Sequence, residues 1–222
     1  MVQVRDRSVR FPMPGRPDNL WPLVWLVVGL LTSYIYIDAA LLSTALFGQR
    51  DPLPTLVIPL FPPQAVVLSV LLLTPPRCWW LYLLAYCAIY VTRTELLGVP
   101  HSIIFLTTVA DVVEPLVGAL LFFRLIPRFT GFAVLREVVI YVGCVTLGAM
   151  LGASVGAAAR ALRDFPFWTS WQSWFLADVL ASLVLAPTII LWAGAGFRGL
   201  RARSPARAIE ATILYGGLLG VG

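Results

Sequence analysis

The order of apolar and polar positions divides the chain into long hydrophobic runs joined by short polar loops. The expected helical runs are residues 20–46, 55–74, 78–91, 102–125, 133–159 and 168–192, and another apolar run begins near residue 208. A helix needs about 20 residues to cross a hydrocarbon core about 30 Å thick. The pattern therefore predicts an all-α fold, a polytopic transmembrane helical bundle with about seven spans.

The last apolar run, residues 209–222, is too short to cross a bilayer at 1.5 Å of rise per residue. We therefore expect the seventh span to be incomplete and the sequence to be truncated at its C-terminus. A cytoplasmic domain beyond it would require at least an eighth span. The expected organisation is a cytoplasmic tail over residues 1–19 and a transmembrane domain over residues 20–222.

Composition and charge agree with a membrane environment. Hydrophobic residues make up 59% of the chain and charged residues 12%, and all 16 basic residues are arginine. With the tail inside, twelve arginines fall on the cytoplasmic side and four on the other, which is a strong positive-inside bias. We therefore expect a multi-pass membrane protein with a cytoplasmic N-terminus, in contact with lipid and not with nucleic acid.

Prolines and glycines mark two unusual helical runs. Three prolines remove backbone donors from the run 55–74 and predict a kink or an interruption: Pro59, Pro62 and Pro63. Glycines recur at intervals of four in the run 133–159 and predict a small-residue packing face: Gly148, Gly152 and Gly156. Such a face suits close packing within the chain, with a homodimer contact as the alternative.

Four polar residues lie inside the apolar runs and are the candidate ligand-binding residues. Asp111 and Asp178 each lie about 15 Å from the outer end of their run, and Gln64 falls near the same depth. Glu114 follows Asp111 by three residues and shares its helix face. Because the runs place no arginine at this depth, the acids are expected to hold a ligand or cation, to carry protons, or to fix helix register by hydrogen bonding.

Enzyme chemistry is not indicated by the remaining residues. The sequence has neither a glycine-rich phosphate loop nor a nucleophile with a histidine partner. Cys78, Cys87 and Cys144 form no CxxC pair and have no nearby histidine, so we expect no metal site. We therefore predict that the chain is not an enzyme and binds no cofactor.

Three segments, in order, resemble the membrane-associated sensor (MASE) domain family of the first class. The segment FPPQAV at 61–66, followed by an apolar run and RCWW at 77–80, is similar to the family's W-P-x-A-G segment and its aromatic-capped third span. The segment DVVEPLVGA at 111–119 resembles G-N-T-L-E-A-L-L-G-A. The stretch WFLADVL at 174–180, ending in LAP at 185–187, resembles W-W-L-G-D-A-L-G…A-P.

The resemblance implies that residues 20–222 are a transmembrane sensor domain of a bacterial inner membrane. It also implies about eight spans in the full domain and a place before a histidine kinase, a diguanylate cyclase or phosphodiesterase modules. By position, Glu114 and Asp178 match acidic residues of the family, and Pro62 and Pro187 match its prolines. Asp111 stands where the family has asparagine. The matches at Glu114, Asp178, Pro62 and Pro187 indicate that these residues are important, but they do not show whether the residues bind a ligand or only pack.

Three functions therefore remain open. The first is a receptor module for two-component or related signal transduction, in which the bundle binds a small molecule or a membrane protein partner and changes its helix packing. The second is a transporter or a substrate-binding transport subunit, because broken helices with polar groups at mid-depth also suit solute passage. The third is a structural membrane scaffold. The ordered motifs favour the receptor.

Overall fold

The structure is a bundle of helices. The computed structural model describes residues 21–47 and 60–201, and the side chains of residues 22–38 and 60–193. Its helices are α1 (Trp21–Phe47), α2 (Pro62–Leu73), the short 3-10 helix η1 (Pro76–Cys78), α3 (Trp79–Leu96), α4 (His101–Leu125), α5 (Leu135–Ala161) and α6 (Phe167–Arg201). No strand occurs in these ranges, so the all-α prediction is confirmed for them.

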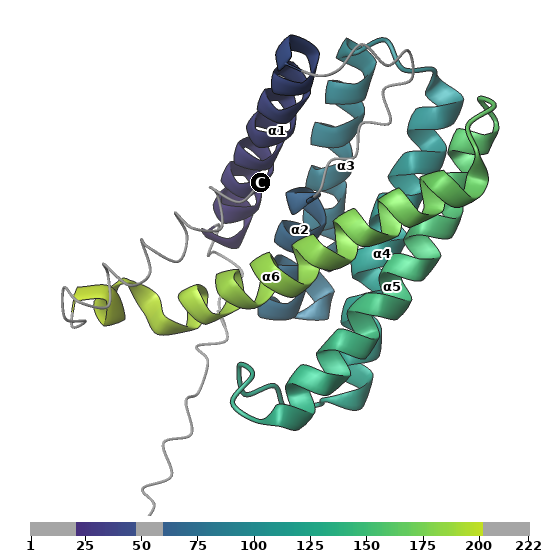
Figure 1. Cartoon of the computed structure of the whole chain (residues 1–222). Coiled ribbons are helices and arrows are strands. Elements are labelled where there is room, and N and C mark those ends of the chain that lie inside the picture. Colours follow the sequence, from purple (N-terminus) through teal and green to yellow (C-terminus); the bar gives the residue numbers. More distant parts are fainter. Residues whose placement is uncertain (1–20, 48–59, 202–222) are drawn as a thin grey trace, which may run out of the picture.

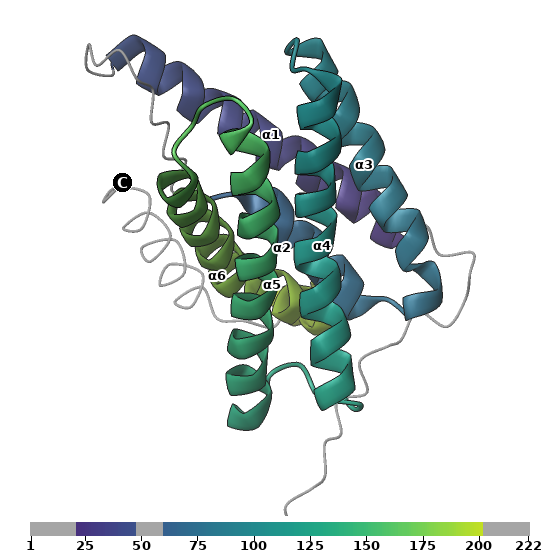
Figure 2. The same ribbon diagram turned by 90° about the vertical axis from the view of Figure 1, so that its right-hand side faces the viewer.

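The helices surround α2. Helices α4 and α5 run side by side, α1 and α3 lie next to each other, and α6 crosses the bundle obliquely (Figure 1). Helix α2 lies among them and contacts α1, α3, α4 and α6 (Figure 2). Every residue from Pro62 to Leu72 is buried, which is the pattern of a helix that is hydrophobic all round.

The expected count of about seven spans is not supported by the described residues. Three of their helices are long and apolar enough to cross a membrane, over His101–Leu125, Leu135–Ala161 and Phe167–Ala193. Helix α2 has 12 residues because it begins at Pro62, and α3 carries Arg93 and Glu95 in its last turns. The predicted seventh run, residues 209–222, lies outside the described residues.

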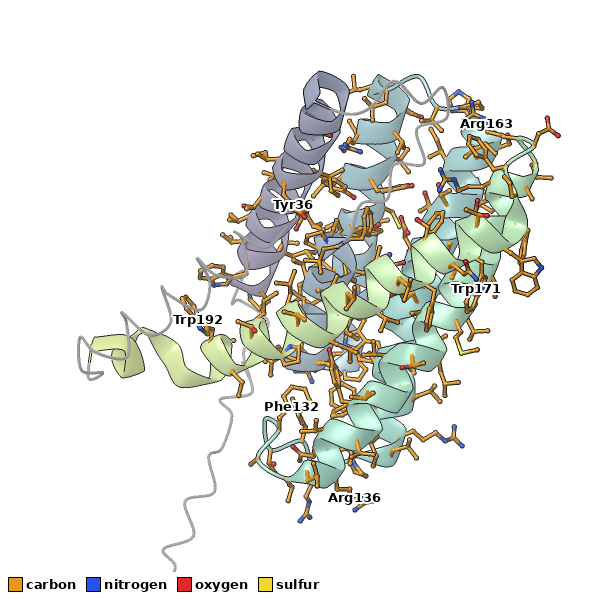
Figure 3. All side chains as sticks on the ribbon, viewed as in Figure 1. Tyr36, Phe132, Arg136, Arg163, Trp171 and Trp192 are labelled. Atoms are coloured by element: carbon orange, nitrogen blue, oxygen red, sulfur yellow. The ribbon has the colours of Figure 1, made fainter. Side chains whose placement is uncertain are left out.

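The outer surface of the bundle is apolar. Large hydrophobic side chains are exposed on all the long helices of the described part, as a lipid-facing surface requires and a water-facing surface does not. Representative exposed residues are Val28, Leu31 and Ile35 on α1, Leu84 on α3, Phe105 on α4, Leu147 and Leu151 on α5, and Leu180 and Trp192 on α6. Figure 3 shows Trp192 projecting outward from α6, whereas Arg136 and Arg163 lie at opposite ends of the bundle.

The α4–α5 loop is held by a buried carboxylate. Glu137, in the first turn of α5, accepts hydrogen bonds from the Thr130 N–H at 2.9 Å, the Thr130 hydroxyl at 2.8 Å and the Phe132 N–H at 2.9 Å. Phe132 has a φ of 63°, a conformation that costs energy for a bulky residue. Its ring packs on Phe129 and Tyr141, which offsets that cost.

Replacing Glu137 by glutamine is expected to destabilise the protein by about 1–3 kcal/mol. Glutamine offers one acceptor oxygen in place of two, and its NH₂ group would face an N–H donor of the loop. The free energy of unfolding in detergent measures the effect, with the exposed Glu95→Gln as control. Equal stability of the two variants would show that the loop does not depend on the second acceptor.

Candidate functional site

A buried polar cluster lies where α2, α3, α4 and α6 meet. We define the polar cluster as Gln64, Tyr86, Asp111, Glu114 and Asp178, each with at most 4% of its surface exposed. The structure thus brings together the four residues singled out from the sequence and adds a tyrosine from α3. That these residues bind a ligand stays a prediction.

Asp111 is the best paired member of the polar cluster. Its Oδ1 accepts a hydrogen bond from Gln64 Nε2 at 3.0 Å, and its Oδ2 accepts one from the Tyr86 hydroxyl at 2.8 Å. The donors come from α2 and α3, and the acceptor comes from α4. Asp111 therefore ties three helices together through both of its oxygens.

Glu114 and Asp178 form the second half of the polar cluster. Their carboxyl groups are neighbours, and Asp178 also lies beside Trp174. Both oxygens of Asp178 and one oxygen of Glu114 make no hydrogen bond within the described residues. The ion pairs of the described residues, Arg93–Asp38 and His101–Glu95, do not involve either acid.

The three glycines of the small-residue face of α5 leave the space that this arrangement fills. A Cβ atom at Gly148 would lie 2.6 Å from the carbonyl oxygen of Glu114, and one at Gly152 would lie 2.9 Å from Cβ of Glu114. A Cβ atom at Gly156 would lie 2.7 Å from the Trp174 ring. The small-residue face therefore packs α5 against α4 and α6 within the chain, directly behind the acids.

The prolines of α2 place its first turn beside Asp178. Pro62 and Pro63 occupy the first two positions of α2, where a backbone N–H would have no intrahelical partner. The N–H of Phe61, just before the helix, donates to the carbonyl oxygen of Ala177 at 3.2 Å. The two prolines thus begin a helix, whereas Pro59 lies outside the described residues.

Pro115 adds a backbone acceptor on the same face of α4. It lies inside the helix, and because it has no N–H, the carbonyl of Asp111 loses its usual intrahelical donor. The neighbouring buried positions on this face are Asp111, Glu114 and Gly118. A proline four residues after an acid inside an apolar run is the sequence signal that predicts this free carbonyl.

Tyrosines extend the polar cluster toward the end of the bundle that carries Arg93. Tyr34 is buried and faces Tyr86, and the Arg93 guanidinium lies 4.8 Å from the centre of the Tyr34 ring. Arg93 also donates to Asp38. Tyr82, Tyr86 and Tyr90 recur at intervals of four on α3, and this stripe was the signal that could have predicted the involvement of α3.

The polar cluster contains more acceptors than donors. Within the described residues, several buried oxygens have no hydrogen-bond partner: Gln64 Oε1, Glu114 Oε2, Asp178 Oδ1, Asp178 Oδ2 and the Tyr34 hydroxyl. Each such atom costs about 1–3 kcal/mol when it is left unpaired. Bringing a group that donates several hydrogen bonds into this place would recover part of that cost.

Comparison with known proteins identifies the family. The sequence model of the family MASE1 matches residues 24–218, which include all the members of the polar cluster. The searches of curated proteins and of solved structures gave no match. MASE1 is a membrane sensory domain of signalling proteins. The resemblance carried by the three sequence segments is thereby confirmed, and the chain belongs to the MASE1 family of membrane-associated sensor domains.

Proposed function

We propose that the chain is the membrane-embedded input domain of a bacterial signal transduction protein whose output is a histidine kinase or a diguanylate cyclase. The polar cluster binds a small ligand, or responds to a membrane partner, and the resulting change in helix packing biases the output domain. Binding can shift such an equilibrium only if the ligand interacts better with one packing than with the other.

The unpaired acceptors at the junction of α2, α4 and α6 are the observation that carries this proposal. Gln64 comes from α2, Glu114 from α4 and Asp178 from α6, so a ligand that pairs their oxygens contacts all three helices at once. Helix α6 crosses the bundle and is the last described helix before the C-terminal residues. A shift of α6 is therefore a direct route from the polar cluster toward a following domain.

The proposed topology places the protein in a bacterial inner membrane with its N-terminus in the cytoplasm. It is supported by the excess of arginines, twelve against four, on the side of the N-terminal tail. Arg136 and Arg163, at opposite ends of the bundle in Figure 3, fall on opposite sides in this topology. We further propose about seven spans in this chain and about eight in the whole domain.

The test is the double substitution Asp111→Asn with Asp178→Asn in the product of the complete reading frame. We expect a membrane-inserted, folded protein whose output no longer changes between growth conditions that switch the unsubstituted protein. Asparagine keeps the size of each side chain and removes its charge. The measurements are membrane yield, elution profile and output activity in cells.

Asp164→Asn is the matched control, because Asp164 is exposed in the α5–α6 loop. Its φ of 62° lies in the left-handed region that asparagine also accepts. We expect this variant to respond like the unsubstituted protein. A normal response of the double variant, with normal yield, would remove the sensory role of the polar cluster.

The alternative function is a transporter or a substrate-binding transport subunit. It is favoured by one feature, the short buried helix α2, which begins at two prolines beside buried polar groups. A transporter moves solute when the chain alone is reconstituted in vesicles, whereas an input domain needs only binding and an output domain. Solute uptake by such vesicles would favour this alternative.

A further inference from the structure

We propose that the polar cluster binds a small protonated amine, a compact cation whose N–H groups donate to the unpaired oxygens of Gln64, Glu114 and Asp178. The inference rests on the proposed function and names the class of ligand for the same place. It concerns binding only, so that it can be tested separately from signalling.

The polar cluster is short of hydrogen-bond donors. Both oxygens of Asp178, one oxygen of Glu114 and the amide oxygen of Gln64 are buried without a partner in the described residues. The amide of Gln64 is oriented by its own bond to Asp111, so its free oxygen is part of the same polar cluster. A complementary ligand must therefore bring several donors and needs no acceptor, which an ammonium group satisfies.

The acidic side chains of the polar cluster favour a cationic ligand. Asp111, Glu114 and Asp178 are buried together, and the ion pairs found in the described residues lie elsewhere. The start of α2 supplies a partial positive charge, but prolines at its first two positions remove two of its potential donors. Buried carboxylates are stabilised when a cation pairs with them and donates hydrogen bonds.

The surroundings of the acids suit an organic amine better than a metal ion. The described residues hold no group of three or more His, Cys, Asp or Glu side chains arranged to bind a metal. Aromatic rings flank the acids instead: Tyr86 contacts Asp111, and Trp174 lies beside Asp178. Carboxylates combined with aromatic rings are a typical environment for organic cations.

The close packing around the acids limits the size of the ligand. Gly152 and Gly156 bring the backbone of α5 against Glu114 and Trp174, so the surroundings of the acids are close-packed and only a compact cation is accommodated. Arg93 already places a guanidinium over the Tyr34 ring, and its partner Asp38 is exposed. A cationic group is thus already held on the ring of Tyr34, which faces Tyr86, the partner of Asp111.

The experiment uses the purified chain in detergent and in lipid nanodiscs at neutral pH, with methylammonium chloride as the probe. Thermal unfolding and the fluorescence of the tryptophans, one of which is Trp174, are followed as the probe is added. Sodium chloride and tetramethylammonium chloride at equal ionic strength are the controls, because neither cation has an N–H donor. We expect a saturable rise in the unfolding midpoint and a saturable fluorescence change with methylammonium only.

Variants assign the binding to the polar cluster. Asp178→Asn and Glu114→Gln are each expected to weaken methylammonium binding at least about tenfold, the equivalent of about 1.4 kcal/mol. Asp164→Asn is expected to leave the affinity unchanged. Glu114→Gln is included so that a conclusion is reached even if Asp178→Asn folds poorly, and the elution profile identifies such a failure.

Equal stabilisation by sodium or tetramethylammonium, the absence of saturation, or unchanged affinity in both cluster variants would each overturn the assignment. The result is distinguishable from the test of the proposed function. If methylammonium does not bind but the Asp111→Asn, Asp178→Asn double variant loses its response, the ligand class is wrong and the sensory role stands. If methylammonium binds and the double variant signals normally, the sensory role is wrong and the amine site stands.

Discussion

Replacing Gly148 by alanine is expected to destabilise the protein by about 1–3 kcal/mol, the usual cost of forcing an extra methyl group into a packed interface. The new Cβ atom would lie 2.6 Å from the Glu114 carbonyl oxygen and 3.3 Å from the Gly118 nitrogen. Both neighbours are backbone atoms of α4, so no side-chain rotation relieves the clash. Helices α4 and α5 must separate, and the free energy of unfolding in detergent reports the cost.

Gly143→Ala is the matched control on the same helix. No atom lies within 4 Å of a Cβ atom at Gly143, and alanine is the better helix former by up to about 1 kcal/mol. We therefore expect this variant to be as stable as the unsubstituted protein or more stable. If Gly148→Ala and Gly143→Ala behave alike, α4 and α5 do not approach as closely as the glycine face indicates.

The glycine face links packing to the acids. Gly152 faces Cβ and Oε2 of Glu114, so its lack of a side chain decides where that carboxyl group lies. Gly156 does the same for the Trp174 ring, which lies beside Asp178. These glycines, which follow one another at intervals of four residues along α5, therefore set the geometry of the polar cluster as well as the distance between the helices.

The positions of most helices could be predicted from the sequence. The expected runs 20–46, 102–125 and 133–159 lie within two residues of α1, α4 and α5 at both ends. Long apolar runs bounded by polar loops have few other solutions in lipid, because backbone polar groups must be paired within the helix. The run 55–74 was predicted less well, since its described helix begins only at Pro62.

The rotation of the helices could not be predicted. A helix that is apolar on its lipid-facing and its buried sides shows little periodicity, so the sequence does not indicate which face meets which neighbour. For this reason the hydrogen bond from Tyr86 to Asp111 and the position of Tyr34 next to Tyr86 were missed. The acids themselves were predicted because ionisable residues in apolar runs are rare and must face the interior.

Replacing Asp111 by alanine is expected to have a larger effect than Gly148→Ala, namely a loss of about 2–5 kcal/mol of unfolding free energy. The change leaves Gln64 Nε2 and the Tyr86 hydroxyl buried without their acceptor, and each unpaired group costs about 1–3 kcal/mol. The bonds that join α2 and α3 to α4 through this side chain are lost together. Unfolding in detergent, followed by circular dichroism, measures the difference.

Asp111→Asn separates hydrogen bonding from charge at the same position. The asparagine oxygen can accept from Gln64 Nε2, and its NH₂ group can donate to the Tyr86 oxygen, because a hydroxyl both donates and accepts. The Tyr86 hydrogen can then turn to the Tyr34 hydroxyl, which faces it and has no partner in the described residues. We therefore expect Asp111→Asn to be at least as stable as the unsubstituted protein, since a buried charge is removed and the network is kept.

The order of the two variants decides what Asp111 contributes. If alanine is strongly destabilising and asparagine is not, the side chain stabilises the bundle through its hydrogen bonds, and its negative charge is available for another role. Loss of the signalling response in the stable asparagine variant would then assign that charge to sensing. If both variants unfold equally easily, the negative charge of Asp111 itself holds the helices together. The polar cluster then has a structural role, and no sensing role of Asp111 is needed to explain it.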